Sequence, residues 1–311
     1  MKQIIKSIIK KIPPLYNFLI FQRKKLIIKA EKTQYILKRW RELFDEELNI
    51  ENPKTYNEKL QWEKIFANNK LAKKCADKIL VREYVKEKIG KDYLNELIGT
   101  YENTKNIDFS KLPNQFVLKA THDSGSVLIV KDKKKIDFEK LKEIERNLKI
   151  NYGHFSKEWV YDDIKPQIII EKFLESEDGK SLKDYKIFYF NGEPKIIQVD
   201  LDRFEGHKRN FYDILWYRLD VEIEYPSVDY DVKKPDLLDK MLEVTKKLAN
   251  PFNQVRVDWY IHHNKLIFGE MTFFHGSGFG KFNSREWEEL IGSWFEVSKD
   301  LSYQKGVKCA E

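Results

Sequence analysis

The chain has 311 residues, of which 41% are hydrophobic and 34% are charged. This length allows one large domain or two to three small ones with a sizeable buried core, so a disordered chain is not the expected state. Lys and Arg number 57 against 50 Asp and Glu, which gives a net charge of +7. That balance suits a protein with anionic partners such as nucleotides, acidic sugars, nucleic acid or a membrane surface.

Two cysteines, Cys75 and Cys309, are too few for a disulfide framework, and neither has a neighbour at metal-ligand spacing. The sequence is therefore typical of a reducing compartment, and we expect the protein in the cytoplasm. No apolar run approaches the roughly 18 to 20 residues that a membrane-spanning helix needs. The six histidines form no HExxH or comparable pair, which argues against a zinc site.

The first 29 residues carry a basic bias that the rest of the chain lacks. They contain no acid and eight basic residues, namely Lys2, Lys6, Lys10, Lys11, Arg23, Lys24, Lys25 and Lys29. Because 57 minus 8 leaves 49 basic residues against 50 acids, the remaining body is nearly neutral. A general nucleic-acid role loses its main support, and we expect no nucleic-acid partner.

Residues 1–30 are expected to form a basic amphipathic segment. Isoleucines recur at helical spacing within residues 1–12 while lysines occupy the other positions, and Pro13 and Pro14 stop the helix. Three roles are open to this segment: docking on the body of the protein, peripheral anchoring on an anionic inner-membrane leaflet, or a nucleic-acid arm.

Residues 31–75 show a polar helical pattern. Thr55 with Glu58 three residues later predicts a capping box at the start of the helix that carries Trp62. A further helix is expected over about residues 71–89, ending near Gly90. No catalytic constellation occurs in this region.

Beyond about residue 90, strand-like runs alternate with helices, and Asn191-Gly192 predicts a hairpin turn. The pattern indicates an α+β body behind a helical N-terminal region. The expected strands cover residues 116–121, 126–130, 168–173, 185–190, 194–201, 255–261 and 266–272, and the expected helices cover 138–149, 235–249 and 285–297.

Lys119 ends one expected strand and is followed by the turn His122-Asp123-Ser124-Gly125-Ser126 before the next strand begins. Backbone N–H groups of such a turn can accept an anion, hydroxyls add donors, and the lysine supplies a point charge. The segment therefore favours either a phosphate-binding loop or a plain hairpin turn, and neither standard glycine-rich phosphate motif is present.

Two other segments bear charged residues at strand ends. Glu171 follows three isoleucines and opens into a polar segment, which suggests a hinge or a surface carboxylate. Asp184 and Lys186 share one face of the next strand. Three basic residues are expected in a loop after its partner strand, where they bind an anionic substrate or form a solvated charge run: Arg203, Lys208 and Arg209.

The segment 255–282 is more informative. Alternation puts Arg256 and Asp258 on one face of their strand, and Glu270 and Thr272 fall on the matching face of the next strand across a short turn. Two carboxylates there repel unless a cation lies between them, and oxygen ligands suit Mg²⁺ that carries nucleotide phosphates. Structural salt bridging is the alternative. The following glycines at 276, 278 and 280 let a loop approach a ligand closely.

These sites, taken in order, resemble the ATP-grasp superfamily. The resemblance is closer to the TupA-like ATP-grasp family, carried by NPKTYNEKLQW at 52–62, LPNQFVLKATHDSG at 112–125 and DYKIFYFNGEPK at 184–195. It implies two α+β subdomains that grip ATP, at residues 76–173 and 174–303, behind the helical region at 31–75. Since no α/β unit precedes them, an acceptor site built from helices is expected, with Trp40 and Trp62 as candidates.

The resemblance also implies roles for individual residues. The lysine at the strand end contacts ATP phosphates, with a basic residue of the preceding helix as its companion. The expected ATP site comprises Arg82, Lys119, Ser124, Gly125, Ser126, Glu171, Phe173, Leu174, Asp184 and Lys186. Asp258 and Glu270 hold Mg²⁺, and Thr272 stands where the family usually has asparagine, a better Mg²⁺ ligand.

The implied chemistry is formation of an acylphosphate from ATP and a carboxylate, followed by attack of an amine. Arg256 is expected at the acylphosphate, Arg203 at the substrate carboxylate and Lys119 at the transferred phosphoryl group. Further substrate contacts are expected from Lys208, Arg209, His275, Gly276 and Ser277. The implied substrate is a uronic acid or similar carboxylate of a surface polysaccharide. A glycosyltransferase using acids such as Asp200 and Asp202, or a non-catalytic binder of acidic polymer, are the alternatives.

Overall fold

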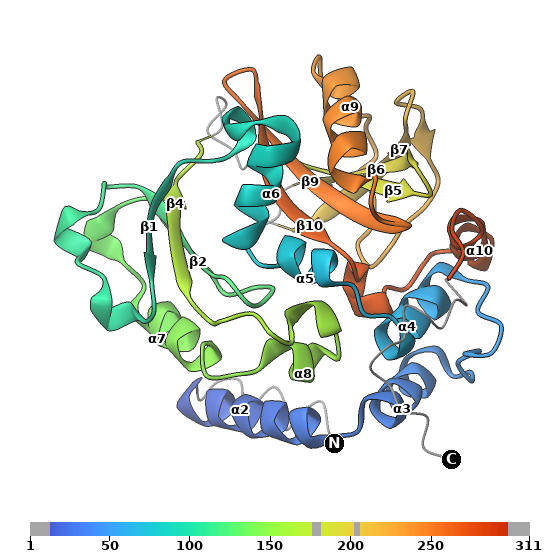
Figure 1. Ribbon diagram of the computed structural model, residues 1–311, viewed down its shortest axis with the longest axis horizontal. Coiled ribbons are helices and arrows are strands. Elements are labelled where there is room, and N and C mark those ends of the chain that lie inside the picture. The colour runs from blue at the N-terminus through green and yellow to red at the C-terminus, as the bar shows by residue number, and fades with distance from the viewer. Residues whose placement is uncertain (1–12, 176–181, 202–205, 298–311) are drawn as a thin grey trace.

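The computed structural model describes residues 13–175, 182–201 and 206–297 (Figure 1). It contains two antiparallel sheets, which confirms the α+β class: a four-stranded sheet ordered β1-β4-β2-β3 and a six-stranded sheet ordered β10-β9-β5-β6-β7-β8. The strands are β1 (Leu97–Tyr101), β2 (Phe116–Ala120), β3 (Val127–Val130), β4 (Ile168–Lys172), β5 (Asp184–Phe190), β6 (Glu193–Leu201), β7 (Lys208–Asp213), β8 (Arg218–Leu219), β9 (Gln254–His262) and β10 (Lys265–Thr272). The α-helices are α2 (Pro13–Lys29), α3 (Lys32–Phe44), α4 (Tyr56–Phe66), α5 (Lys70–Ala76), α6 (Leu80–Ile89), α7 (Phe138–Asn147), α8 (Tyr152–Ser156), α9 (Leu238–Ala249) and α10 (Arg285–Ser293).

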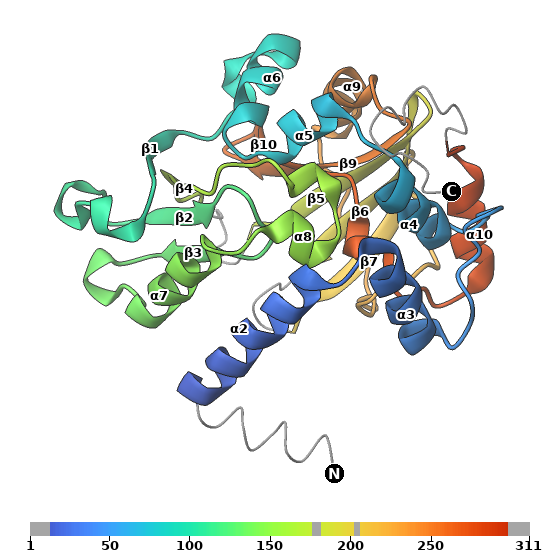
Figure 2. The same cartoon turned by 60° about the horizontal axis from the view of Figure 1, so that its bottom comes forward.

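Helix α2 begins at Pro13, a position where the fixed φ and missing N–H of proline suit the first turn of a helix. The helix expected over residues 1–12 lies outside the described residues. Figures 1 and 2 both place α2 beside α8, and Lys157 donates to the carbonyl oxygens of Ile27 and Ala30 at 2.7 and 2.8 Å. The described part of the N-terminal segment is therefore docked on the body. None of the described helices has the length and apolar character needed to span a bilayer.

Helix α4 begins with the capping box expected from the sequence. Thr55 accepts a hydrogen bond from the Glu58 backbone N–H, and Glu58 accepts one from the Thr55 backbone N–H at 2.9 Å. The single helix expected over residues 71–89 is wrong, because α5 ends at Ala76 and α6 begins at Leu80. The Asp77 carboxylate accepts from the N–H groups of Ile79 and Leu80 at 2.7 and 3.1 Å, which gives α6 a new N-terminus.

The four-stranded sheet has one apolar face and one that carries charge. Leu118 of β2 and Ile170 of β4 are completely buried, and Ile144 of α7 packs in the same cluster. Because side chains alternate along a strand, Lys119 and Glu171 lie on the opposite face. Helix α7 thus covers the apolar face and leaves the charged face to the interior of the protein.

The six-stranded sheet is divided in the same way. Its apolar face packs under α9, where Met241 and Val244 are buried and Trp259 of β9 donates to Thr245 Oγ1 at 2.8 Å. The central strands carry charged side chains on the other face, and Lys186 of β5 lies directly opposite Asp258 of β9. The sheets are thus each covered on one side, and their charged faces remain for the site.

Both hairpin turns indicated by the sequence are present. Asn191 and Gly192 join β5 to β6 with φ of 41° and 95°, and His263 and Asn264 join β9 to β10 with φ of 47° and 54°. Two residues with positive φ match the right-handed twist of the paired strands. The second turn sets the register as far as Phe268 opposite Trp259, and a bulge between Phe268 and Met271 then shifts it by one residue, which brings Thr272 opposite Arg256.

Two further sequence expectations are wrong. Lys208 and Arg209 begin strand β7 rather than a loop, and Arg209 lies opposite Asp200 of β6, whose carboxylate compensates its charge inside the sheet. Trp40 cannot line an acceptor site, because it is 1% exposed and packs on Phe44 with ring centroids 4.4 Å apart. Its amphipathic helix α3 buries the tryptophan against the rest of the N-terminal region.

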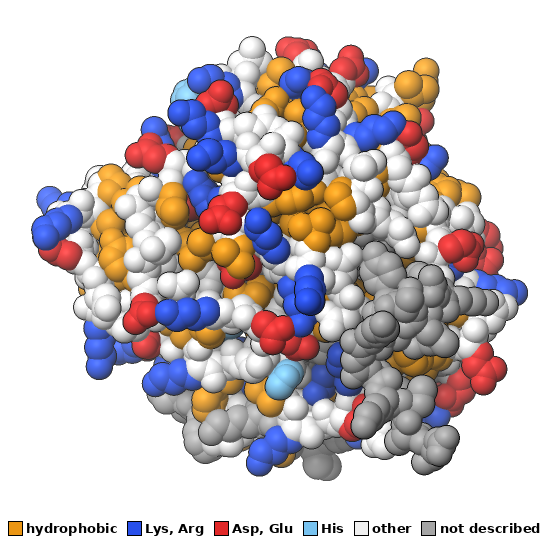
Figure 3. Space-filling model, in the orientation of Figure 1, with side chains coloured by type: hydrophobic (Ala, Val, Ile, Leu, Met, Phe, Trp, Pro, Cys, Tyr) orange, Lys and Arg blue, Asp and Glu red, His pale blue; other side chains and the backbone are white. Residues whose placement is uncertain are grey.

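Acidic and basic side chains are interspersed over the molecular face seen in Figure 3. This mixture fits the near balance of charge outside residues 1–29. Hydrophobic side chains appear between them in the same view. The net charge of the chain therefore does not make this face uniformly basic.

Gly292 joins α10 to the start of α4. A Cβ at this position would lie 2.2 Å from the carbonyl oxygen of Lys54 and 2.8 Å from the backbone nitrogen of Tyr56. We predict that Gly292→Ala lowers the free energy of unfolding by about 1–3 kcal/mol, because the helix must move off the backbone that it touches. Urea unfolding measures this change. Glu289→Ala, at an exposed position of the same helix, serves as control and shifts it by less than about 0.5 kcal/mol; equal losses would contradict the prediction.

Candidate active site

A row of alternating charges crosses the polar face of the six-stranded sheet. Its members come from strands β10, β9, β5, β6 and β7, and each interior member lies between groups of opposite charge. The row consists of Glu270, Arg256, Asp258, Lys186, Asp184 together with Asp200, and Arg209. Apart from Glu270, the six side chains of the row, three cations and three carboxylates, are each at most 9% exposed.

Lys186 occupies the centre of the row. Its Nζ donates to Asp184 Oδ2 at 2.5 Å and to Asp258 Oδ2, and Asp200 Oδ2 lies 3.9 Å away. Burial lowers the pKa of Lys186, but Asp184 and Asp258 outweigh it and hold the pKa above its ordinary value. Burial likewise raises the pKa of Asp200, and Arg209 and Lys186 reverse this effect, so that it lies below its ordinary value. Lys186 and Asp200 are therefore charged at neutral pH.

Arg256 joins both strands of the β9–β10 hairpin. Its Nε and Nη2 donate to the two oxygens of Asp258 at 2.7 Å, and Nη2 reaches Glu270 Oε1 at 3.3 Å and Thr272 Oγ1 at 3.0 Å. Burial lowers the pKa of Arg256, and the Asp258 carboxylate more than offsets this, so the pKa is raised. These four residues share a face, as predicted, but they do so because of the bulge in β10, which strand alternation does not include.

A second charged cluster lies on the four-stranded sheet. Glu171 accepts from Lys119 Nζ at 2.7 Å and from Arg82 Nη1 at 2.9 Å, while Arg82 Nη2 donates to the Asn95 carbonyl oxygen at 2.6 Å. Lys119 retains 26% exposure of its side chain, whereas Glu171 retains 9%. The cluster brings together three expected site residues, Arg82, Lys119 and Glu171, from three elements.

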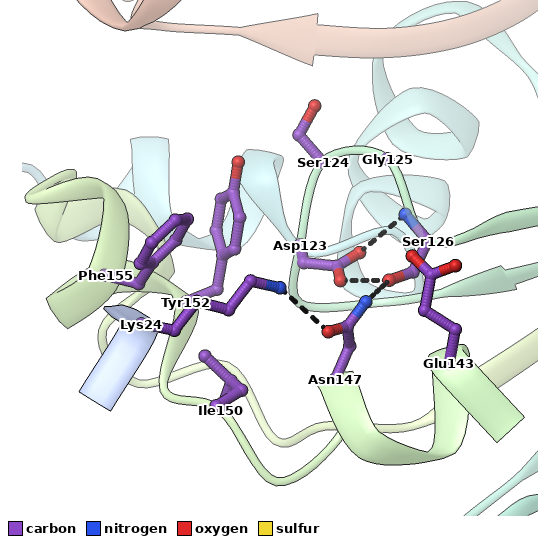
Figure 4. A pocket seen from close by; sticks show the side chains of 10 residues that line it. All are labelled: Lys24, Asp123, Ser124, Gly125, Ser126, Glu143, Asn147, Ile150, Tyr152 and Phe155. Carbon is purple, nitrogen blue, oxygen red and sulfur yellow. Dashed lines mark hydrogen bonds between the residues drawn. The ribbon is translucent and has the colours of Figure 1, made fainter. Parts of the chain in front are cut away.

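The turn after Lys119 is held by its own side chains. Asp123 accepts from the Ser126 backbone N–H at 3.4 Å and from Ser126 Oγ, and Gly125 has φ of 107°. Ser126 Oγ also accepts from Asn147 Nδ2 at 3.0 Å, and Asn147 Oδ1 accepts from Lys24 Nζ of α2 at 2.9 Å (Figure 4). Ser124 points away from this network in the same view.

These groups line a cavity of about 210 Å³ between α2, α7, α8 and the turn, with the rings of Tyr152 and Phe155 on one side (Figure 4). Burial lowers the pKa of Lys24, which enters from α2. The cavity lies on the α2 side of the turn.

Lys78 links the two clusters and was not among the candidates from the sequence. It donates to the carbonyl oxygen of Asp123, and its charge interacts with Glu270 and Lys119. Burial lowers the pKa of Lys78 despite the opposing effect of Glu270. The only available signal was its place in the Asp77-Lys78 pair before a helix, which by itself indicates no role.

The donor set fits a hard divalent cation. Asp258 and Glu270 supply carboxylate oxygens, and Thr272 Oγ1 lies 3.2 Å from Glu270 Oε1. Glu270 keeps 46% of its side chain exposed, whereas Asp258 lies under Arg256 and Lys186. No cluster of three or more His, Cys, Asp or Glu side chains could hold a metal within the described ranges. Further oxygen ligands must then come from a bound substrate or water, as is usual for Mg²⁺.

Comparison with known proteins assigns the chain to a family. Residues 58–296 match the family model described as TupA-like ATPgrasp. The chain belongs to the TupA-like ATP-grasp family. This match confirms the family inferred from the sequence, and with it the ATP-grasp fold.

Several ATP-grasp ligase structures are similar to the chain, although no curated protein sequence matches it. The D-alanine–D-alanine ligase from Bacillus anthracis complexed with ATP is 14% identical, with a TM-score of 0.40, covering 67% of this chain and 57% of that one. The D-alanine–D-alanine ligase from Helicobacter pylori is 16% identical, with a TM-score of 0.36 and coverages of 66% and 52%. The ATP-grasp ligase PsnB with minimal precursor variant, Mg and ADP is 8% identical, with a TM-score of 0.38 and coverages of 69% and 56%. The chain thus spans less than two thirds of each of these structures.

The remaining expected site residues of this family member are dispersed. Phe173 and Leu174 are partly buried just after β4, and Arg203 lies outside the described residues. Lys208 and Arg209 are in β7, where Arg209 is part of the charge row. Asp200 of the acidic pair is bound by Arg209, and Asp202 is not described.

The loop after β10 holds His275, Gly276 and Ser277 in a short 3₁₀ turn. His275 is 4% exposed and packs edge-on against Phe188, with centroids 5.1 Å apart. Burial is the main cause that holds the pKa of His275 well below its usual range, and the nearby charges of Arg256 and Arg209 lower it further. The ring is therefore neutral. His275 therefore lies inside the site as an uncharged packing group.

Ser277 is part of a buried ion-pair network. Lys64 Nζ of α4 donates to the backbone oxygen and to Oγ of Ser277, both at 2.6 Å, and Ser277 Oγ donates to Glu158 at 2.6 Å. Burial lowers the pKa of Lys64 to about 8, and it raises that of Glu158. The network holds the loop after β10 against α4.

We predict that Lys64→Met lowers the free energy of unfolding by about 3–5 kcal/mol, because it leaves the Glu158 carboxylate buried without a cation. The double variant Lys64→Met/Glu158→Gln removes that uncompensated charge and regains most of the loss. Urea unfolding of both variants tests this. A single variant within about 1 kcal/mol of the wild type would show that the pair does not hold this loop.

Proposed function

We propose that the protein is an ATP-dependent carboxylate–amine ligase that forms an amide through an acylphosphate. The observation that carries this proposal is Lys78, whose charge interacts both with Lys119 of the four-stranded sheet and with Glu270 of the six-stranded sheet. Lys119 and Lys78 bring cations from one side, and Arg256, Asp258 and Glu270 bring a cation and hard oxygen ligands from the other. Membership of the TupA-like ATP-grasp family supports it.

ATP binds between the sheets in this proposal. Lys119 and Lys78 contact the phosphates, and the Ser124–Ser126 turn offers backbone N–H groups to them. Arg82 positions Lys119 through Glu171, which both bind. The segment after β4, with Phe173 and Leu174, meets the base, and the row around Asp184 and Lys186 meets the rest of the nucleotide. Membership of the TupA-like ATP-grasp family supports ATP as the nucleotide.

The reaction requires charge neutralisation and alignment more than covalent help from the protein. An oxygen of the substrate carboxylate takes the γ-phosphoryl group of ATP, which breaks the bond to ADP. The amine then attacks the acyl carbon, phosphate leaves, and the amine proton passes to solvent or to the departing phosphate. Mg²⁺, held by Asp258, Glu270 and Thr272, supplies charge neutralisation on the phosphates.

Arg256 is assigned to the phosphorylated carboxylate, since its guanidinium lies between Asp258 and the half-exposed Glu270 on the polar face of the six-stranded sheet. Lys186 binds the Asp258 carboxylate and fixes its orientation. The proposed acid is a uronic acid or similar carboxylate of a surface polysaccharide or its precursor, with Arg203 and Lys208 as further contacts.

The decisive experiment incubates the protein with ATP, Mg²⁺, a panel of uronic acids and a panel of amines, and follows ADP and phosphate. Release of ADP that depends on both an acid and an amine supports the ligase. Release of UDP from a UDP-sugar without consumption of ATP would instead identify a glycosyltransferase. Binding of acidic polymer without nucleotide turnover would leave only a binding protein.

We predict that Lys119→Ala and Glu270→Ala each lower kcat for ADP formation by about 100-fold or more, because the first removes a cation from the transferred phosphoryl group and the second removes a carboxylate ligand of Mg²⁺. We expect both variants to fold, because a charged partner remains for each buried group. Glu171 is still paired with Arg82 in the first variant, and Arg256 is still paired with Asp258 in the second. Lys105→Ala and Glu289→Ala are controls that remove exposed charges. Undiminished turnover in both site variants would refute the assignment.

We further propose that residues 1–29 bind an anionic membrane surface. The outward side of α2 exposes Leu19 by 42% and Leu26 by 71%, and Arg23 and Lys29 lie on the same side of the helix. The inward side is fixed by Lys24 and by the backbone contacts with Lys157. An apolar and basic stripe on a docked helix suits the headgroup region of a bilayer.

We predict that the full chain floats with phosphatidylglycerol vesicles and that Leu19→Glu/Leu26→Glu lowers the bound fraction severalfold, since each glutamate adds repulsion where an apolar side chain inserts. Vesicles of phosphatidylcholine alone are the lipid control. Leu80→Glu, on an exposed leucine of α6, is the matched protein control. Equal flotation of all variants would exclude α2 as the membrane contact.

A further inference from the structure

The charge row extends beyond Arg209 to a carboxylate in an unusual backbone conformation. Glu224 has φ of +65°, and the N–H of Tyr225 donates to the Ile223 carbonyl oxygen at 2.8 Å. A hydrogen bond between residues two apart around a positive φ defines a rare and strained γ-turn. Such strain persists only where neighbouring contacts hold it.

Several contacts hold this turn. Arg209 Nη1 donates to the same Ile223 carbonyl oxygen at 2.8 Å, and the N–H of Glu224 donates to the Lys281 carbonyl oxygen at 3.0 Å. Ile223 also forms an isolated bridge with Phe282. The charge row and the loop after β10 thus both fix the direction of the Glu224 side chain.

The Glu224 side chain lies against a surface kept free of side chains. A Cβ on Gly276 would be 3.2 Å from Glu224 Oε1, and one on Gly280 would be 3.5 Å from Glu224 Cγ. Glu224 nevertheless stays 37% exposed, and Arg209 Nη1 lies 3.7 Å from Oε2. The carboxylate is therefore held in place at the wall of the site while part of it faces solvent.

The charge balance of the row indicates what the Glu224 carboxylate could bind. Its interior contains three cations, Arg256, Lys186 and Arg209, and the three carboxylates of Asp258, Asp184 and Asp200. These formal charges cancel. The two ends, Glu270 at 46% and Glu224 at 37% exposure, carry the remaining negative charge. Each end is thus suited to a cation from outside the row.

Glu270 faces the proposed nucleotide site, next to Lys78. Glu224 lies at the far end, beside a second cation-binding element: Tyr225 is 39% exposed, and its ring already lies under the Arg209 guanidinium at 4.9 Å and against His207 at 3.9 Å. Aromatic faces and carboxylates together bind ammonium groups.

We propose that Glu224 and Tyr225 form the binding site for the ammonium group of the amine substrate, an inference that rests on the proposed ligase function. A protonated amine approaching Lys78 and Lys119 would be repelled, because these two lysines lie outside the balanced interior of the row. Glu224 offers a half-exposed carboxylate at the other end of the row, beyond its contact with Arg209, and the glycines at 276 and 280 let its side chain lie against the loop after β10. The role assigned to Glu224 is binding and not proton transfer.

The first test uses propylammonium chloride as probe, with ionic strength held constant by NaCl. NMR follows the ring signal of Tyr225, identified by its loss in Tyr225→Phe. We expect a saturable shift in the wild type and a Kd about tenfold higher or more in Glu224→Gln, the loss of one charge-assisted hydrogen bond. Asp220→Asn, which removes an exposed carboxylate from the same segment, is the control and keeps the wild-type Kd. Propionate at equal concentration produces no saturable shift.

This titration needs neither ATP nor a carboxylic acid, so it decides the inference even if the ligase assay fails. Absence of a saturable shift in the wild type, or the same Kd in Glu224→Gln, would overturn it. Tyr225→Leu, read from the amide signals of the 223–226 turn, gives a second variant and is expected to weaken the probe severalfold. In the ligase assay, Glu224→Gln raises KM for the amine and leaves KM for ATP within about twofold.

Discussion

The buried contact between Lys186 and Asp258 is the interaction on which the rest of the site depends. Lys186 has 4% and Asp258 2% of its side chain exposed, so neither charge is tolerable without the other. The antiparallel register of β5 and β9 places them directly opposite each other. Arg256 continues the row to Glu270 of β10, and Asp200 continues it to Arg209 of β7. Each buried charge along the row is compensated by the next one. The order of strands in the sheet therefore also fixes the order of charges.

A second consequence concerns how the two sheets are joined. Lys119 and Arg82 share Glu171, which leaves that cluster with more positive than negative charge, and Lys78 lies between it and Glu270. The charged face of the small sheet thus meets the acidic end of the row. In the proposed function, the cations of the small sheet and the oxygen ligands of the large sheet bind phosphates together, which neither sheet could do by itself.

The sequence predicted what depends on local periodicity. Strand alternation placed Arg256 with Asp258 and Glu270 with Thr272, and the two-residue turns gave the hairpins. The two pairs share one face because a bulge in β10 shifts the register by one residue, which the sequence did not indicate. The prediction from sequence failed where the partner of a charged residue lies in another strand or helix. The charged start of β7 was read as a loop, because the Asp200 carboxylate that lets Arg209 enter a sheet belongs to another strand. The sequence did not predict a role for Lys78 or Glu224 for the same reason. The function of a single charged residue depends on neighbours that only the fold brings to it.

The polarity of the row also explains why the two ends differ in construction. Glu270 lies at a bulge in β10, where the register with β9 shifts between Phe268 and Met271, so the strand itself presents the carboxylate. Glu224 follows the last strand of the sheet, where no further ladder exists, and a strained turn tied to Arg209 takes over that task. A sheet can hold charges rigidly only as far as its strands extend. Beyond β7 and β8 the direction of a carboxylate must be fixed by loop contacts, and the glycines at 276 and 280 are the condition for those contacts to close around Glu224.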